Sequence, residues 1–237
     1  MMKDQFPIEV TEQRTVRRIT IKQSITDFLD AFNVERGLIY TLKLLFTKPG
    51  MLIRYYLKEG RFKIVNAFRL LIITTALSLV LLSVTDSFEV LFEPQGESAE
   101  ASEMSKLVNT LYTDWYNLML WLSIPSYALF NYILFRKYER FNYAEHLVIQ
   151  SFIVSVSNIL VIIFLPLGYV VGFQVALLIS FLLSFVYFLL AFIDLFKTRS
   201  FGFFVRGIMA YILGNFLYYL VFGAALATGM FDLLVDK

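Results

Sequence analysis

The hydrophobic positions of this chain fall into long runs, and the clearest run is Phe68–Val84, FRLLIITTALSLVLLSV. It contains no charged residue after Arg69 and neither Gly nor Pro. With its apolar flanks it reaches about 20 residues, the length that a helix needs to cross roughly 30 Å of hydrocarbon. The run therefore predicts a transmembrane helix.

Similar apolar runs follow to the end of the chain and predict an all-α, polytopic membrane protein. An acidic stretch, 85–114, separates the first run from the second and is expected to lie outside the cytoplasm. Pro166 and Gly168 are expected to end the third run, because both residues interrupt helices. Five transmembrane helices are predicted, at about 65–84, 115–135, 147–167, 174–196 and 206–230.

The first 63 residues show a different pattern, in which apolar residues recur at helical spacing between polar ones. In residues 20–32, Ile21, Ile25, Phe28 and Leu29 share one helix face. Two more helices are expected at about 35–46 and 51–58, separated by Lys48-Pro49-Gly50. This pattern predicts a region of amphipathic helices, 1–63, that lies on the membrane or packs on protein.

Charge then sets the expected orientation. Thirteen of the 21 Lys and Arg residues precede or begin the first span, and three each lie between spans two and three and between spans four and five. Under the positive-inside rule this asymmetry places the N-terminus in the cytoplasm and the C-terminus outside. The expected location is a cytoplasmic (inner) membrane.

Composition limits the chemistry. Hydrophobic residues make up 58% of the chain, which contains no cysteine and a single histidine, His146. These counts exclude disulfides, cysteine-ligated zinc and iron–sulfur clusters, and sites with two or three histidines. No catalytic motif is present, so no cofactor, metal site or catalytic residue is predicted, and an enzyme is the less favoured reading.

Basic residues beside aromatic ones, just before a membrane span, suit a layer of anionic headgroups. We therefore predict that lipid or a protein partner docks on one surface of the N-terminal region; ordinary topology marking is the simpler explanation of the same charges. Nucleic acid is not an expected partner. The docking residues are Arg54, Lys58, Arg61, Lys63, Tyr55 and Tyr56.

Polar residues inside the predicted spans are the other candidates, because such groups usually face the interior of a helix bundle. They either hold helices together or line a pathway, and no charged residue lies at mid-span. These residues are Asn131, Gln150, Asn158, Ser184, Asp194 and Asn215. Glu145 and His146, at the start of span three, suit either proton chemistry or a hydrogen-bonded anchor at the membrane surface.

Two stretches resemble a known family. Residues 41–68, TLKLLFTKPGMLIRYYLKEGRFKIVNAF, fit the pattern T-x-K-x-L, P-G and Y-L-x-G-x-R of the bacterial membrane domain-of-unknown-function family 3667, with one extra residue, Glu59. Pro49, Gly50 and Gly60 carry this match, and Glu145-His146 resembles the start of a later span there. The family's N-terminal zinc ribbon is absent. The resemblance implies an integral membrane protein and no activity.

The leading hypothesis is a non-enzymatic scaffold or interaction protein that docks anionic lipid, a protein partner or a second copy through its basic N-terminal helices. One alternative is a small transporter or channel subunit, favoured by the polar residues of spans three and four. The other is a lipid-binding or lipid-modifying enzyme that uses Glu145 and His146.

Overall fold

The computed structural model describes residues 37–58, 64–85, 87, 121 and 123–227, with side chains up to 221, and these residues are mostly helical. The helix expected at 20–32, most of the acidic stretch 85–114, and Gly60, Arg61 and Lys63 lie outside the described residues. The two short helices expected before the first span form at α2 (Ile39–Thr47) and α3 (Pro49–Lys58).

Four helices are long and apolar enough to cross a membrane, which makes this a membrane protein. They coincide with the first, third, fourth and fifth predicted spans, and α7 continues through the short turns η2 (Leu165–Leu167) and α8 (Gly168–Val171). The second predicted span stays a prediction, because only its part over 121 and 123–135 is described, and that part is helical. The four helices are α4 (Ala67–Val84), α7 (Tyr143–Phe164), α9 (Phe173–Phe196) and α10 (Phe201–Ala227).

Local sequence explains where these helices begin. The Asn66 side chain caps α4 by accepting hydrogen bonds from the N–H groups of Phe68 and Arg69, at 2.9 and 3.3 Å. Asn142 caps α7, and Glu145 completes a reciprocal capping box with it. Each cap satisfies N–H groups that have no partner inside the helix.

The turn between α7 and α9 depends on a proline and a glycine. Pro166 lies at the start of η2, where its missing N–H costs no hydrogen bond. The helical path therefore continues to Val171, a few residues past the end that the sequence predicts. Gly172 then reverses the chain with φ +91°, a conformation that residues with a Cβ rarely adopt.

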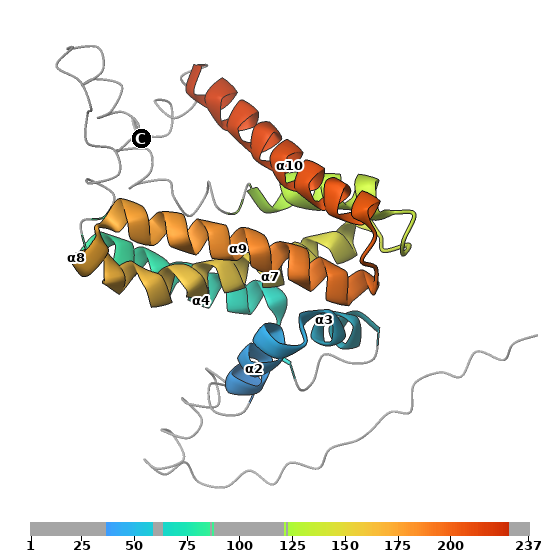
Figure 1. The fold of residues 1–237 in the computed structure, drawn as a ribbon, viewed down its shortest axis with the longest axis horizontal. Helices are drawn as coiled ribbons and strands as arrows, with labels where there is room; N and C mark the ends of the chain where they lie inside the picture. The colour runs from blue at the N-terminus through green and yellow to red at the C-terminus, as the bar shows by residue number, and fades with distance from the viewer. Residues whose placement is uncertain (1–36, 59–63, 86, 88–120, 122, 228–237) are drawn as a thin grey trace, which may run out of the picture.

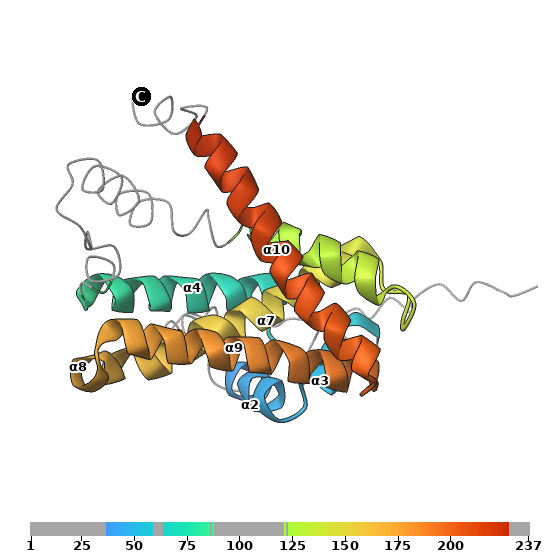
Figure 2. The same cartoon turned by 45° about the horizontal axis from the view of Figure 1, so that its top comes forward.

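Helices α4, α7 and α9 run side by side, and both α4 and α9 pack on α7 (Figures 1 and 2). The first two run in the same direction and α9 runs back, while α10 crosses α9 obliquely. The 123–135 helix lies beside the first turns of α10.

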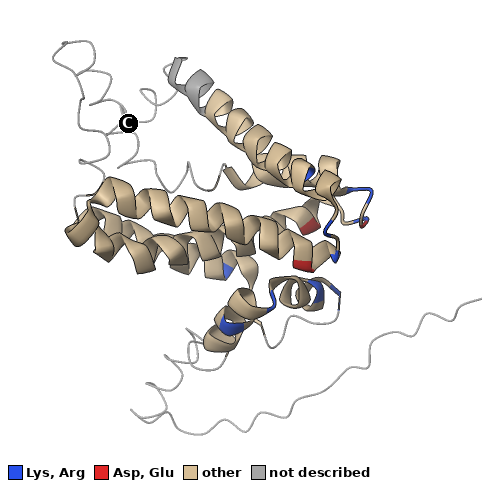
Figure 3. Cartoon of the chain, in the orientation of Figure 1, with Lys and Arg blue, Asp and Glu red and all other residues tan. Residues whose placement is uncertain are grey.

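Charged residues gather at one end of the bundle. Figure 3 shows them where α4 and α7 begin and α9 ends, and on α2 and α3. We call this the basic end, defined by Arg136, Lys137, Arg140, Lys197 and Arg199. Described residues at the opposite end, near α8, are uncharged. The outer surface of the bundle between the two ends is apolar, as lipid contact requires.

An aromatic cluster joins three helices close to the basic end. Phe135, from the 123–135 helix, lies 4.8 Å from Phe192, 5.2 Å from Phe196 and 4.9 Å from Phe203 between ring centroids. All four rings are buried. Contacts of this geometry add about 0.5–1.5 kcal/mol per pair beyond area burial, so they fix the 123–135 helix and the start of α10 against α9.

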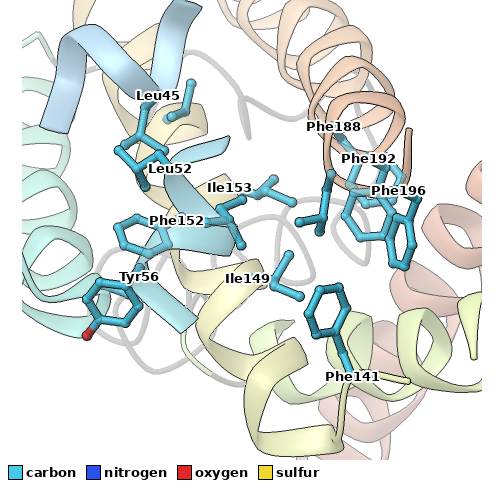
Figure 4. Close-up of a cluster of buried hydrophobic side chains, with 14 of the residues drawn as sticks. Leu45, Leu52, Tyr56, Phe141, Ile149, Phe152, Ile153, Phe188, Phe192 and Phe196 are labelled. Atoms are coloured by element: carbon cyan, nitrogen blue, oxygen red, sulfur yellow. The ribbon is translucent and has the colours of Figure 1, made fainter. Parts of the chain in front are cut away.

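Helices α2 and α3 pack against the side of the bundle near the basic end. Figure 4 shows Leu45, Leu52 and Tyr56 facing side chains of α7 and α9, and all three are at most 3% exposed. Tyr56 meets Phe152 edge to face at 5.2 Å. At Gly50 the backbones approach so closely that a Cβ would lie 2.3 Å from the carbonyl carbon of Asp194.

We predict that Gly50→Ala weakens the packing of α3 on α9, because its methyl group would overlap the α9 backbone. Overpacking of this kind costs about 1–3 kcal/mol. Thermal unfolding in detergent micelles should show a lower midpoint. Gly202→Ala is the matched control, since a Cβ there meets nothing within 4 Å. Equal midpoints for both variants would contradict the prediction.

Candidate functional site

The N-terminus of α3 is capped by a carboxylate from a distant helix. The Gly50 N–H, in the first turn of α3, donates to Asp194 Oδ2 at 2.8 Å. N–H groups in a first turn have no intrahelical partner, and the helix dipole favours a negative charge there. Asp194, predicted as an intramembrane polar residue, therefore anchors α3 to the last turn of α9.

Two cations of α3 share one carboxylate on the segment after the 123–135 helix. Arg54 lies 2.9 Å from Glu139 Oε2, and Lys58 Nζ lies 2.8 Å from Oε1. Arg54 also donates to the carbonyl of Leu195, one of the last carbonyls of α9. The Arg54 and Glu139 side chains are 26% and 21% exposed, so solvent screens this pair only in part.

Helix α2 is tied to the bundle by two hydroxyl groups. Tyr187, in the middle of α9, donates to the Leu45 carbonyl at 3.0 Å. The buried Thr41 hydroxyl donates to Gly37 O at 2.6 Å and accepts from Val65 N–H at 3.0 Å, which links α2 to the segment before α4. We call the combined contacts of Thr41, Leu45, Gly50, Arg54 and Lys58 the α2–α3 anchor.

Four of the six predicted docking residues are described, and they differ in their surroundings. Arg54 and Lys58 pair within the protein, Tyr56 is buried and Tyr55 is half-buried beside Lys48 and Lys197. Arg61 and Lys63 lie outside the described residues. Whether lipid or a partner docks on this region stays a prediction.

Cations outnumber carboxylates at the basic end, and the carboxylates are already engaged. Glu139 holds Arg54 and Lys58, Asp194 caps α3, and Glu145 accepts from the Asn142 N–H at 2.7 Å. These three are the acidic residues of the described part of the chain. Its eleven cations are Lys43, Lys48, Arg54, Lys58, Arg69, Arg136, Lys137, Arg140, Lys197, Arg199 and Arg206.

A basic crevice of about 810 Å³ lies where the 123–135 helix ends and α10 begins. Arg136, Lys137, Arg140 and Arg206 line it, together with the paired Glu139. Arg206 donates to the Tyr138 hydroxyl at 2.8 Å, and Lys137 Nζ lies 4.9 Å from the centre of that ring. This crevice concentrates positive charge around one aromatic side chain.

The positive charges around Tyr138 also act on its phenol. Burial raises its pKa, but hydrogen bonds with Ser200 and Arg206 and the charges of Arg206 and Lys137 outweigh burial, so the pKa is lowered from its usual value. A lowered pKa means that the surroundings favour a negative charge at this oxygen. An anion in the crevice would meet the same field.

Glu145 and His146 occupy different environments although they are adjacent in sequence. The Glu145 carboxylate serves the capping box of α7 and is half-exposed. The His146 ring is fully buried, with the rings of Tyr132 and Phe141 each 6.1 Å away. Within the part of the chain that the structure describes, neither nitrogen of His146 has a hydrogen-bond partner.

The polar residues of the spans form cross-helix contacts and line a cavity. Asn131 Nδ2 donates to Gln150 Oε1 at 3.1 Å, which joins the 123–135 helix to α7. Asn158 Nδ2 donates to Thr75 Oγ1 at 2.9 Å and to Thr74 Oγ1 at 3.4 Å, which joins α7 to α4.

Ser184 and Asn215 bond to backbone carbonyls one turn earlier in their own helices. Both line a cavity of about 310 Å³ between α7, α9, α10 and the 123–135 helix. Four of the six predicted intramembrane residues line it: Gln150, Asn158, Ser184 and Asn215.

Sequence reasoning missed Glu139, Thr74 and Thr75. Glu139 is the only acidic residue in the basic stretch 136–140. A single carboxylate among cations could have indicated that it pairs with cations elsewhere in the chain. Thr74 and Thr75 offered no such signal, because threonine hydroxyls in apolar helices usually bond within their own helix. Thr74 does bond in this way, to the Leu70 carbonyl at 2.9 Å.

The chain is similar to a known family over part of its length. The family model described as Protein of unknown function (DUF3667) matches residues 35–79, so the chain resembles that family over α2, α3 and the first part of α4. This match confirms the resemblance found in residues 41–68. No curated protein and no solved structure matches the chain. The matched stretch includes the residues of the α2–α3 anchor.

We predict that Arg54→Glu and Glu139→Arg each lower the unfolding midpoint in detergent, because each leaves like charges facing each other. Charge-assisted hydrogen bonds contribute about 1.5–3 kcal/mol. The double exchange Arg54→Glu with Glu139→Arg should recover part of the loss, since opposite charges face each other again. Recovery stays partial because glutamate cannot donate to the Leu195 carbonyl. Additive losses in the double variant would contradict the pairing.

Proposed function

We propose that this chain is a non-enzymatic inner-membrane protein of bacteria that binds anionic lipid headgroups at its basic end and positions its membrane bundle there as a scaffold. The observation that carries the proposal is the basic crevice lined by Arg136, Lys137, Arg140 and Arg206. The nearby carboxylates are engaged elsewhere, so these cations remain available for an external anion.

Phosphate is the anion that this chemistry favours. Arginine guanidinium groups bind phosphate oxygens in pairs, and three of the four cations in the crevice are arginines. A cation near an anionic membrane surface contributes about 1 kcal/mol to binding. Because the crevice lies around the first turns of α10, near the end of a membrane-length helix, the proposal places it at the level of the lipid headgroups.

The N-terminal helices extend this surface in the proposal. A second crevice, of about 800 Å³, lies between α2, α3 and the end of α9, and Lys48, Lys197 and Tyr55 line it. The ion pairs of Arg54 and Lys58 with Glu139 join α3 to the segment that lines the first crevice. A protein partner or a second copy of the chain remains the alternative occupant of this basic surface.

The proposed topology follows from the same charges. The positive-inside rule places the basic end, and with it α2 and α3, in the cytoplasm. Parallel α4 and α7 require the chain to cross back between them, which supports a second span over 115–135. Five spans then place the C-terminus outside.

A small transporter or channel subunit is the second candidate, favoured by the polar cavity among the spans. Flux of small solutes into liposomes is its test. Lipid modification by Glu145 and His146 is the third candidate, and it would have to release Glu145 from its capping box. Turnover that is unchanged in Glu145→Gln and His146→Ala would remove it.

We predict that replacing Arg136, Lys137 and Arg140 together by Gln reduces the phosphatidylglycerol that stays with the protein. The measurement is native mass spectrometry after extraction from bilayers of phosphatidylglycerol and phosphatidylcholine. Loss of one cation's contribution of about 1 kcal/mol corresponds to roughly a five-fold decrease in affinity. We expect at least that decrease for three cations.

The matched control replaces Arg136 and Arg140 by Lys, which keeps the charge and should retain most of the lipid. The unfolding midpoint should change little in the Gln variant, because the ion pairs of the described residues lie on Glu139. Unchanged phosphatidylglycerol in the Gln variant would overturn the proposal.

A further inference from the structure

The cavity among the membrane helices is uncharged and rich in hydrogen-bonding groups. Ten of its sixteen lining residues carry a hydroxyl or amide group and none carries a charge. Its volume of about 310 Å³ is at the lower end of the range typical of small-molecule sites. Figure 2 shows the helices that supply the lining, α7, α9, α10 and the 123–135 helix.

Two buried amides in the cavity wall retain unused hydrogen-bonding capacity. Gln150 uses its carbonyl oxygen to accept from Asn131, and its NH₂ group has no partner in the described chain. Asn158 uses its NH₂ group on Thr74 and Thr75, and its carbonyl oxygen has no partner there. Each residue is 3% exposed. The wall thus offers a donor and an acceptor that the protein itself leaves unfilled.

The two amides are placed so that one ligand could reach both. They lie eight residues apart on α7, about 12 Å along the helix at 1.5 Å per residue. A buried polar group without a hydrogen bond costs about 1–3 kcal/mol. A ligand that displaces water from this cavity must therefore supply hydrogen bonds to both amides.

The other lining residues indicate which kind of ligand the cavity could bind. The absence of charge among the lining residues favours a neutral molecule, because a buried ion needs a counter-charge. Hydroxyl groups both donate and accept, as the two amides require. Aromatic rings, among them Tyr127, Phe181 and Tyr211, offer apolar faces against which the C–H face of a sugar ring can pack.

We propose that this cavity binds a small, uncharged polyhydroxylated solute, of the size of a hexose or a polyol. Gln150 donates to one hydroxyl of that solute and Asn158 accepts from another. The site lies among the membrane-length helices, which is where transporters place their substrates. It is separate from the basic crevice, so it does not depend on the proposed lipid binding.

The absence of native cysteines allows a direct test in the full-length protein in nanodiscs. Ser157→Cys and Ser184→Cys place a thiol of nearly the original size in the cavity wall. A water-soluble methanethiosulfonate reagent should label both positions. Glucose, inositol and sorbitol are the neutral probes at about 100 mM, and we expect at least one of them to slow labelling several-fold. Gluconate, which carries a charge, should not slow it.

Two control positions define the background. Ser151→Cys lies on the same helix and is buried, but does not line the cavity. Leu182→Cys lies on the exposed apolar side of α9. Both should label far more slowly than the cavity positions. Ser151→Cys gives the labelling rate of the buried core, and Leu182→Cys gives that of the lipid-facing surface.

Two outcomes would overturn the proposal. Absence of labelling at Ser157→Cys and Ser184→Cys would show that lipid or protein, rather than aqueous solute, fills the cavity. Labelling that no neutral probe slows, or that gluconate slows equally, would show that the cavity holds water without selecting neutral polyols. Neither outcome affects the phosphatidylglycerol measurement, so this proposal and the proposed function fail separately.

Discussion

The hydrogen bond from the Gly50 N–H to the Asp194 carboxylate is the constraint around which the basic end is built. It joins the first turn of α3 to the last turn of α9, 144 residues away in sequence. It requires a residue without a side chain at position 50, because the two backbones nearly touch there. Once α3 is fixed in this way, Arg54 reaches both the Leu195 carbonyl and Glu139. The interaction combines a helix cap and close backbone packing in one contact.

The contacts at the basic end also determine which cations are paired with carboxylates. Positive residues at the end of a membrane bundle repel one another unless carboxylates or external anions intervene. The protein uses its few described acidic residues for structure, with Glu139 holding α3, Asp194 capping it and Glu145 capping α7. The crevice around Tyr138 is consequently left with excess positive charge, which the lowered pKa of that phenol reflects. The same contacts that hold α2 and α3 in place therefore create the surface to which we assign lipid binding.

Within the bundle, amide groups lie among apolar helices rather than at a charged surface. A polar side chain among apolar helices must find a partner or incur a desolvation cost. Asn131 and Gln150 satisfy each other in part, and Asn158 bonds to α4. The Asn131 carbonyl oxygen stays buried without a partner in the described chain, whereas Gln150 and Asn158 line the cavity. Tyr127, also in the cavity wall, packs on Gly214, where a Cβ would lie 2.4 Å from its ring. Residues that hold helices together and residues that line a cavity are thus largely the same residues, and the two readings of these polar positions are not exclusive.

The sequence by itself determined the membrane class, four of the helix positions and the gathering of cations beside them, since these depend on local hydropathy, caps and charge. Asn66, Asn142 and Gly172 act within a few residues of their own positions, so their roles depend on local sequence, although no cap was predicted at either asparagine. The structure alone decided that Arg54 and Lys58 face Glu139, that Asp194 caps α3 and that Asn158 meets Thr74 and Thr75. Each of these contacts joins residues more than 80 positions apart, and a linear pattern of hydrophobic and charged residues does not specify which distant partner a polar group meets. That choice follows from how the helices pack, which depends on the shapes of side chains brought together only in the folded bundle.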